Sequence, residues 1–272
     1  MINVSIFINR SFSMKSKLII LISSLWIISC EGTDEIFVSS SESFEPGSCE
    51  SRVVSRGLYY EQDNNQFLWA GEDSTTHFNI TNWSLNVCNL KKGLGREAFH
   101  SPHSPDYELL SKTDTHYPDD AQAVIVNFEN TVKVFPLTVM TRYETVNEVI
   151  DGEPIAIVYC FLAELATVYK RNYCGETLTF AVSGYTYRDA DNFDGKESFI
   201  LWDRNSESLW WPIKDLSVAG AYQGQTMIKY NFGKWGLADF AKIRRIYPSA
   251  LVLVTEQPLK ESGTIKPLDG CS

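Results

Sequence analysis

The sequence predicts an α+β fold that is rich in β-strands, with short strands and hairpins in a mixed or antiparallel sheet and two helices. Short apolar runs recur along the chain, turn-forming residues separate them, and only two segments show helical spacing. Long helices do not alternate with these runs, which argues against a doubly wound parallel sheet. Hydrophobic residues make up 44% of the 272 residues, which is enough for a substantial core.

The first strands are predicted close to the start of the folded region. Residues 58–60 and 66–70 are apolar and flank Asp63-Asn64-Asn65, a pattern typical of a β-hairpin. Residues 77–83 are a further strand candidate. The segment 91–121 contains several glycines and prolines and is expected to be mostly loop.

The clearest strand signals lie in the second half of the chain, where apolar runs are bounded by turn residues. The predicted strands are 124–128, 132–135, 155–160, 165–170, 178–183, 199–202 and 250–255. The first two form a predicted hairpin around residues 129–131, which Pro136 ends.

Two helices are predicted from apolar residues spaced by three or four positions. Val139, Tyr143, Val146 and Ile150 would share one face of a helix that ends at Asp151-Gly152. The second helix has its apolar residues at Leu237, Phe240, Ile243 and Tyr247, and Pro248 closes it.

The start of the chain resembles a bacterial lipoprotein signal with its lipobox. Lys15 and Lys17 precede an apolar run, residues 18–29, and Cys30 follows it. The run is too short for a membrane-spanning helix, which needs about 20 apolar residues. Cleavage before Cys30 and lipidation of its sulfur would anchor the protein to a membrane, since several acyl chains give stable attachment. The alternative is an ordinary secreted protein with Cys30 in a disulfide.

Four parts of the chain follow from this interpretation. Residues 1–29 are the predicted signal peptide, and residues 30–52 are a polar, Ser-rich and flexible tether. Residues 53–258 form a single β-rich domain, and residues 259–272 are an irregular tail.

The charge of the chain limits its partners. The formal net charge is −10, and it becomes −13 when Arg10, Lys15 and Lys17 leave with the signal peptide. An acidic protein repels phosphate backbones, so nucleic acid is not an expected partner. The same balance argues against binding to anionic lipid through a basic patch. The expected membrane contact is therefore the N-terminal lipid alone, and the protein or small-molecule partner stays open.

The cysteines are consistent with a location outside the reducing cytosol. If Cys30 is lipidated, five of the six cysteines remain, so at least one is free or pairs between chains. A cell-envelope location permits disulfides. Cys160 ends a predicted strand and Cys174 follows the next strand near the opposite end of that hairpin, so a bridge between these two is not expected.

Short motifs along the chain resemble the bacterial domain-of-unknown-function family 3179 over about residues 78–255. The clearest are Val146-Asn147-Glu148, Gly152-Glu153-Pro154, Val158-Tyr159-Cys160, residues 179–184, Asp203 with residues 207–210, and Tyr247-Pro248 with Val252-Leu253. The resemblance implies the fold and a cell-envelope setting, and it implies no particular reaction.

The chain departs from this family at the two places that most suggest chemistry. The family typically has Trp-His-Glu where this chain has Arg142-Tyr143-Glu144, and Cys-Pro-Leu-Cys-Gly-Ser where it has residues 160–165. A Cys-x-x-Cys pair with a histidine could bind metal or exchange thiols and disulfides. Ala163 and Tyr143 remove that pair and that histidine, so such an activity would be lost or altered here.

The candidate catalytic residues are Cys160, Glu144 and Asn147. A lone buried cysteine is more often an inert apolar residue than a nucleophile. Glu144, Asn147 and Glu148 would lie on one side of the predicted helix, where paired carboxylates can serve acid–base chemistry if burial separates their pKa values. The alternative is an ordinary solvated helix face.

Two segments are candidate metal sites. Asp189, Asp191 and Asp194 lie in a run rich in oxygen ligands, which suggests calcium. Phe193 occupies the position where an EF-hand needs Asp or Asn, so a solvated hairpin tip is the alternative. His100 and His103 have a spacing that zinc permits, but they lie in a Pro-rich loop without cysteine. The sequence leaves the cofactor open.

The tryptophans allow two interpretations as well. Trp202, Trp210, Trp211 and Trp235 could line a groove for a sugar or peptide, although core packing is more usual.

The sequence therefore favours a lipid-anchored binding or assembly module of the bacterial cell envelope. The alternative is an envelope enzyme, redox or metal-dependent, with its site around Cys160.

Overall fold

The computed structural model describes residues 51–71, 76–96, 98–113, 116–129 and 131–254. The predicted signal peptide with Cys30, nearly all of the predicted tether and the predicted tail lie outside these residues. All described residues belong to one compact unit. Within the described ranges, no helix has the length and apolar character needed to cross a bilayer.

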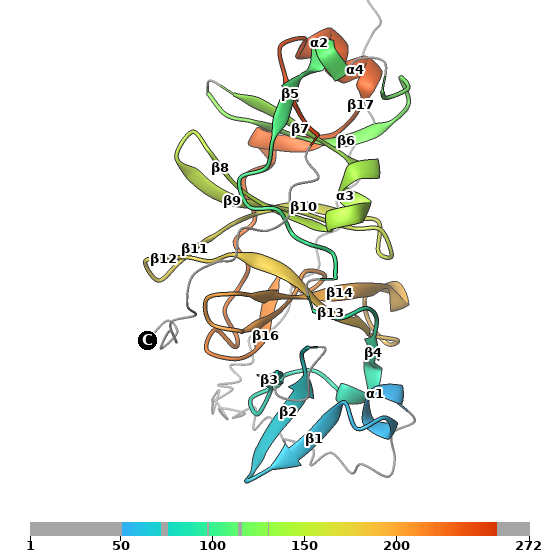
Figure 1. Cartoon of the computed structure of the whole chain (residues 1–272), viewed down its shortest axis with the longest axis vertical. Coiled ribbons are helices and arrows are strands. Elements are labelled where there is room, and N and C mark those ends of the chain that lie inside the picture. Colours follow the sequence, from blue (N-terminus) through green and yellow to red (C-terminus); the bar gives the residue numbers. More distant parts are fainter. Residues whose placement is uncertain (1–50, 72–75, 97, 114–115, 130, 255–272) are drawn as a thin grey trace, which may run out of the picture. The chain divides into compact units, whose positions relative to one another are not determined.

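The described chain is mainly β-structure in mostly antiparallel sheets (Figure 1). The strands outside the first and middle sheets are β4 (Leu90–Lys92), β5 (Tyr107–Leu109), β6 (Gln122–Asn127), β7 (Val132–Pro136), β11 (Asn172–Tyr173), β12 (Glu176–Thr177), β13 (Phe180–Arg188), β14 (Glu197–Asp203), β15 (Leu209–Trp211), β16 (Leu216–Ala219), β17 (Trp235–Asp239) and β18 (Leu251–Leu253). The pairing of β18 with β7 is parallel. The prediction of a β-rich fold is confirmed, with more sheet than α+β implies.

The first sheet is built on the hairpin that the sequence predicted. β1 (Tyr59–Gln62) and β2 (Asn65–Trp69) are antiparallel, and β3 (His77–Asn79) pairs with β2. The turn residues Asp63 and Asn64 have φ of 52° and 63°. Asp and Asn tolerate this left-handed conformation better than other residues with a Cβ atom, which explains the tight turn.

The middle sheet has the order β10-β9-β8. β8 (Thr145–Ile150), β9 (Glu153–Cys160) and β10 (Leu165–Lys170) are joined by short turns and pair antiparallel. Side chains alternate between the two faces along each strand, so both faces can be buried. Ile157 belongs to the apolar cluster on one face and Val158 to the cluster on the other.

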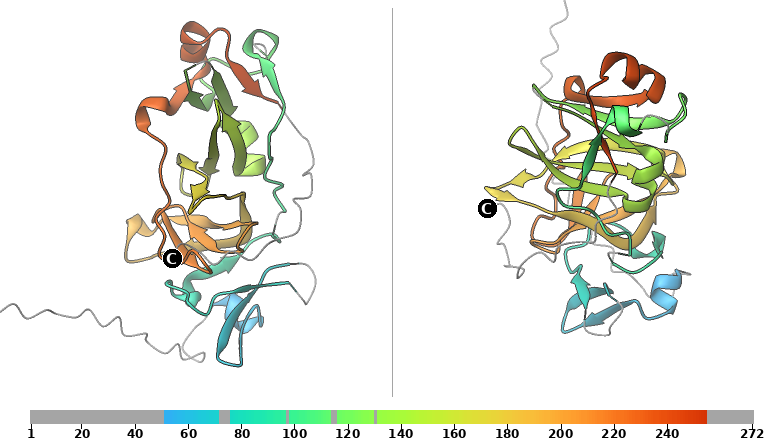
Figure 2. Two further views of the ribbon diagram at one scale, coloured as in Figure 1. Left: turned by 90° about the vertical axis from the view of Figure 1, so that its left-hand side faces the viewer. Right: turned by 45° about the horizontal axis from the view of Figure 1, so that its top comes forward.

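Two larger sheets pack on the middle sheet. The sheet β17-β6-β7-β18-β5 shares an apolar cluster with one face, and the sheet β16-β15-β14-β13-β4 shares a cluster with the other. Figure 2 shows the middle strands between these two sheets. The middle sheet is therefore an internal layer, and a polar residue on either face of it is buried.

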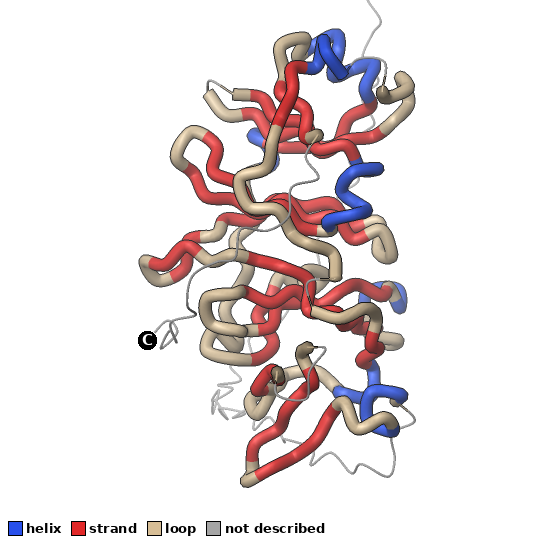
Figure 3. The backbone as a smooth tube through the Cα atoms, in the orientation of Figure 1, coloured by secondary structure: helices blue, strands red, loops and turns tan. Residues whose placement is uncertain are grey.

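The described part contains four α-helices, against the two that were predicted (Figure 3). They are α1 (Arg52–Ser55), α2 (Leu110–Thr113), α3 (Leu137–Tyr143) and α4 (Phe240–Ile246), and the 3-10 helices are η2 (Val87–Asn89), η3 (Phe193–Gly195) and η4 (Phe232–Lys234). The two predicted helices correspond to α3 and α4, but Leu237, which was expected on the second helix, lies in β17. β5 and α2 lie in a segment that was expected to be mostly loop.

The helix predicted over residues 139–150 is wrong in its second half. α3 ends at Tyr143, Glu144 has φ of 56°, and residues 145–150 form β8. Val146 and Ile150 are four residues apart, which is about one helical turn and also two strand repeats. Their spacing therefore could not distinguish the two structures. Asp151-Gly152 forms the turn between β8 and β9 instead of a helix end.

Candidate functional site

The structure brings two of the three predicted catalytic residues together. Cys160 is the last residue of β9, and Glu144 lies between α3 and β8. The backbone N–H of Tyr159 donates to the Glu144 carbonyl at 2.8 Å, so the two residues lie at the same end of the middle sheet. Asn147 lies further along β8, and its side-chain amide is hydrogen-bonded to the backbone of Phe180.

Cys160 is part of the core. It is fully buried, its thiol is free, and it belongs to the apolar cluster between the middle sheet and β13–β14. Burial raises the pKa of the thiol, and the nearby Glu144 raises it further, although backbone hydrogen bonds from Phe199 and Ala163 act in the opposite direction. The thiolate is the nucleophilic form, so this environment makes Cys160 less reactive.

Glu144 is the most perturbed carboxyl of this end. The residue is 5% exposed, and burial raises the pKa of its side chain from 4.5 to about 7. Its carboxyl makes no hydrogen bond or ion pair with any of the described residues. A carboxyl with this pKa is partly protonated near neutral pH, as a general acid or base requires.

Asn147 connects two layers of the fold. Its side-chain amide donates to the Phe180 carbonyl at 2.7 Å and accepts from the Phe180 N–H at 2.8 Å. The side chain is fully buried and joins β8 to β13. Both of its polar atoms are occupied by backbone, so Asn147 is a structural residue in this arrangement.

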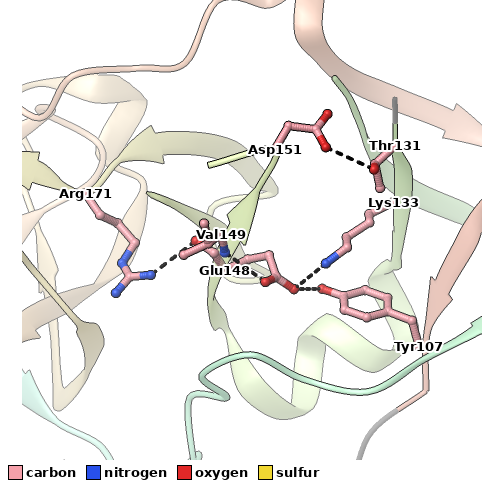
Figure 4. Close-up of polar contacts among 7 residues, drawn as sticks. All are labelled: Tyr107, Thr131, Lys133, Glu148, Val149, Asp151 and Arg171. Carbon is pink, nitrogen blue, oxygen red and sulfur yellow. Dashed lines mark hydrogen bonds and ion pairs between the residues drawn. The ribbon is translucent and has the colours of Figure 1, made fainter. Parts of the chain in front are cut away.

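The expectation that Glu144, Asn147 and Glu148 share one helix side is wrong. Asn147 and Glu148 are neighbours on a strand, so they face opposite sides of the middle sheet. The Glu148 carboxylate accepts from Lys133 Nζ at 2.8 Å and from the Tyr107 hydroxyl at 2.5 Å (Figure 4). It also accepts from the N–H of Val149.

The acidic run is a turn between β13 and β14. The Asp189 carboxylate accepts from the N–H groups of Asp191 and Asn192, both at 3.1 Å. Its pKa is lowered mainly by the side-chain hydrogen bond from Asn192. Within the residues that the structure describes, no three His, Cys, Asp or Glu side chains are grouped to hold a metal ion. This geometry gives no support to calcium at Asp189, Asp191 and Asp194.

The four tryptophans are core residues. Trp202, Trp210 and Trp211 are at most 3% exposed, and Trp235 is 9% exposed. The Trp210 indole donates to the Asp203 carboxylate at 2.8 Å, which satisfies its polar atom inside the protein. They do not form an open groove.

Two of the three described cysteines are oxidised. Cys88 and Cys174 are each disulfide-bonded, whereas Cys160 is free. The expectation that Cys160 and Cys174 do not form a bridge is confirmed.

Sequence reasoning missed a buried arginine at the opposite end of the middle sheet. Arg171 directly follows β10 and is 1% exposed. Its Nε donates to the Leu178 carbonyl at 2.6 Å. Its Nη1 donates to the Glu148 carbonyl at 3.2 Å, as Figure 4 shows. Its Nη2 donates to the Thr179 hydroxyl at 3.3 Å. Arg171 forms no ion pair with any described residue, which is unusual for a buried charge.

A second arginine and a histidine lie close to Arg171. Arg204 follows β14, is 8% exposed, and its Nη2 donates to the Ser101 carbonyl at 3.5 Å. Burial lowers the pKa of Arg171 to about 10, with repulsion from Arg204 acting in the same direction. The pKa of His103 is lowered by burial first and then by the two arginines, while Glu148 acts to raise it. We call Arg171, Arg204 and His103 the cationic cluster.

The loop that contains His103 is held against β8. The Asn147 N–H donates to the Pro102 carbonyl at 2.8 Å, and the Ser104 N–H donates to the Asn147 carbonyl at 3.1 Å. His103 and Asn147 form a parallel bridge through these bonds. The fully buried Ser101 hydroxyl, on the same loop, has no hydrogen-bond partner among the described residues.

Residues 100–269, more than half of the chain, match the family described as "Protein of unknown function (DUF3179)". The chain belongs to this family. The resemblance inferred from the motifs is thereby confirmed. Neither the curated proteins nor the solved structures contain a match to the chain. Both ends of the middle sheet, with Cys160 and with the cationic cluster, lie inside the range that matches DUF3179.

The charge around Arg171 bears on the chemistry of this part of the DUF3179 domain. The one carboxylate among the causes that shift its pKa values is that of Glu148, and this carboxylate is already bound to Lys133. Arg171 therefore has no carboxylate bound to it among the described residues. Guanidinium forks and a histidine are the groups that proteins use to bind oxyanions. His103 is the exposed member of the cluster, whereas both arginines are buried.

Proposed function

We propose that the protein is a lipid-anchored protein of the bacterial cell envelope whose folded domain binds a small oxyanion and acts by binding, not by catalysis. The cationic cluster is the proposed binding site. Cys30 is the proposed lipid attachment site, and the membrane contact is made through this lipid. The acidity of the chain makes nucleic acid an unsuitable source of the anion.

One observation supports the binding function above all others. Arg171 is a fully buried cation without an acidic partner among the described residues, and it lies beside a second arginine. Burying a charge without a counter-charge costs free energy, so a fold that keeps Arg171 buried in this way gains from an added anion. The buried Ser101 hydroxyl, still without a partner, would supply one more polar group to that anion.

The disulfides support the proposed location. Disulfide bonds persist in oxidising compartments and are rare in the cytosol. Cys88 and Cys174 are disulfide-bonded, in agreement with a chain that is exported by a lipoprotein signal.

Mass spectrometry of the N-terminal peptide tests the proposed lipid anchor at Cys30. We expect a chain that begins at Cys30 and carries acyl groups, and an unmodified Cys30 would contradict the proposal.

An anion titration of the purified lipidated chain in detergent tests the binding function. Inorganic phosphate and acetate are the probes, with calorimetry and the NMR signal of His103 as readouts. A bound anion should raise the pKa of His103, because it offsets the repulsion from Arg171 and Arg204 and adds to the attraction from Glu148. Arg204→Gln should weaken binding roughly tenfold or more, because it removes charge-assisted hydrogen bonds.

His100→Gln is the matched control for this titration. His100 is exposed and lies on the same loop as His103, so the change has the same size without touching the cluster. It should leave binding unchanged, whereas His103→Gln should weaken it. If neither probe binds, or if the control weakens binding as much as Arg204→Gln, the cluster is not an anion site.

A second candidate is an envelope enzyme, redox or metal-dependent, with its site at Cys160, Glu144 and Asn147. One observation favours it, namely the pKa of about 7 that burial gives to Glu144 beside a thiol. Three observations weigh against it. Cys160 is buried in an apolar cluster, the Asn147 amide is bound to backbone, and Ala163 stands where a second cysteine would be needed. Binding is therefore the better supported function.

A further inference from the structure

A cavity of about 520 Å³ lies beside α1 and β4, outside the range that matches the family. Its described lining includes Arg52, Arg56, Lys91 and Lys92 and no acidic side chain. A net charge of −10 for the whole chain gives no hint of such a pocket. We call it the basic pocket.

Two of its four cations are held by neighbours. Lys91 forms an ion pair with Glu197, which lies outside the described lining. Lys92 Nζ lies 4.5 Å from the centroid of the Trp69 ring, a cation–π contact that fixes its position. Burial lowers the pKa of Lys92, and repulsion from Arg56 lowers it further. Glu197 thus offsets the charge of Lys91, whereas Lys92 has no acidic partner among the described residues.

The other two cations are arginines that no described residue holds. Arg52 and Arg56 are exposed, and their guanidinium groups make no hydrogen bond or ion pair with the described residues. They lie at the start and just after the end of α1 and line the same cavity. Guanidinium groups bind phosphate through paired N–H donors, so this arrangement suits a phosphate group better than a neutral ligand.

The position of the pocket in the chain identifies the source of that phosphate. Residues 31–50 alone separate Cys30 from Ser51, which also lines the pocket. Even a fully extended chain of this length spans no more than about 70 Å. A lipid on Cys30 would therefore keep the pocket near the bilayer surface, where phospholipid headgroups are the most concentrated phosphates.

We propose that the basic pocket binds the phosphate of an anionic phospholipid headgroup and so orients the domain on the membrane. This inference rests on the proposed lipid anchor for its setting. An acidic chain is repelled by an anionic bilayer, and that repulsion should turn the rest of the surface away. The prediction that the N-terminal lipid makes the membrane contact alone is then incomplete, since a local pocket departs from the average charge.

Vesicle binding by the processed chain without its acyl groups tests the pocket. Residues 30–272 with Cys30→Ser keep every described residue, and the vesicles contain phosphatidylcholine with or without phosphatidylglycerol. We expect binding only to the vesicles with phosphatidylglycerol. Arg56→Gln should weaken it roughly fivefold, and Arg52→Gln with Arg56→Gln should weaken it roughly 25-fold, from the usual contribution of each basic residue near such a surface.

The matched control is Lys242→Gln with Arg245→Gln. These two residues are exposed on α4 and the change in net charge is the same, so general electrostatics is held constant. The control should bind like the parent chain. Equal losses in the two double variants would overturn the proposal, as would equal binding to both kinds of vesicle. Arg56→Gln alone provides a test that does not depend on how the double variant folds.

Sodium phosphate separates a headgroup from a free anion. At ionic strength matched with sodium chloride, phosphate should displace the chain from vesicles only in the millimolar range or above. Saturation of the basic pocket by micromolar phosphate, without binding to phosphatidylglycerol, would show that the pocket binds a soluble ion. It would contradict the proposal that the ligand is a phospholipid headgroup. Neither result bears on the acylation of Cys30 or on the NMR signal of His103, so the proposed function is tested independently of the basic pocket.

Discussion

The two ends of the middle sheet bury ionisable groups with opposite results. At one end, burial raises the pKa of Glu144 to about 7 and raises the pKa of the Cys160 thiol. Both changes favour the neutral forms. At the other end, burial lowers the pKa of Arg171 only to about 10, so its guanidinium stays charged at neutral pH.

The difference comes from the chemistry of the groups. A carboxyl or a thiol can lose its charge at moderate cost when it is buried, because its ordinary pKa is within reach of neutral pH. A guanidinium cannot, so the fold must supply acceptors for its five N–H groups. The carbonyls of Leu178 and Glu148 and the hydroxyl of Thr179 accept three of these hydrogen bonds, but they bring no negative charge. The buried charge that remains, and not burial itself, distinguishes the proposed binding end from the end with Glu144 and Cys160.

The largest effect on this comparison is expected from Arg171→Gln. Glutamine cannot reach all three acceptors, so the Leu178 and Glu148 carbonyls would lose their donors inside the protein. We expect the free energy of unfolding to fall by about 4 kcal/mol, because each buried unsatisfied group costs about 1–3 kcal/mol. Denaturant unfolding under non-reducing conditions measures this loss.

Lys170→Gln is the control for that change. Lys170 is the neighbouring residue, also basic, and exposed. The expected loss is within 0.5 kcal/mol, roughly the limit for surface substitutions. If both variants lose the same stability, the buried arginine has no special role in the fold.

Glu144→Gln tests the end of the middle sheet with Glu144 and Cys160 through the pH dependence of its stability. The pKa of Glu144 in the folded chain, about 7, lies above its ordinary value of 4.5, so the folded state binds the proton more tightly. The stability linked to this proton is complete below pH 4.5 and is lost as the pH rises to 7 and above. Glutamine has no such loss, so at pH 8 the variant should be more stable than the parent chain by about 3 kcal/mol.

The comparison requires unfolding curves at pH 4.5 and pH 8. The two chains should have similar stability at the lower pH and differ at the higher one. Glu164→Gln is the control, because Glu164 is exposed in the turn after β9. A Glu144→Gln chain that is less stable at both pH values would mean that the carboxylate has a partner in solution, as a catalytic carboxylate would.

The sequence predicted the strands of the middle sheet better than it predicted which residues meet at the ends of that sheet. The runs at residues 155–160 and 165–170 are apolar and bounded by turn residues, and they became β9 and β10. The second half of the predicted 139–150 helix failed because Val146 and Ile150 fit both periods. The predicted catalytic set lost Asn147 for the same reason, since its helix neighbours became strand neighbours on opposite faces.

The cationic cluster could not be found by looking for motifs. Its members are separated by at least 30 positions in the chain, and His103 joins the two arginines because the backbone of Asn147 holds its loop against β8. One local signal did exist. Thr167 and Tyr169 face the same side of β10, and Arg171 continues that alternation, so a strand pattern predicts that it points inward. A charged residue at an inward position is the feature to look for.

The smallest effect is expected from Cys160→Ala. Removing a buried sulfur leaves a small void, which should cost about 1 kcal/mol in the free energy of unfolding. The rise in the pKa of Glu144 is caused by burial, so the variant should keep the same pH dependence of stability between pH 4.5 and 8. Unfolding of the variant across this range measures both quantities. A shift of the pH dependence by a full unit would mean that the thiol and the carboxyl share a proton, which would make this end of the sheet the reactive one.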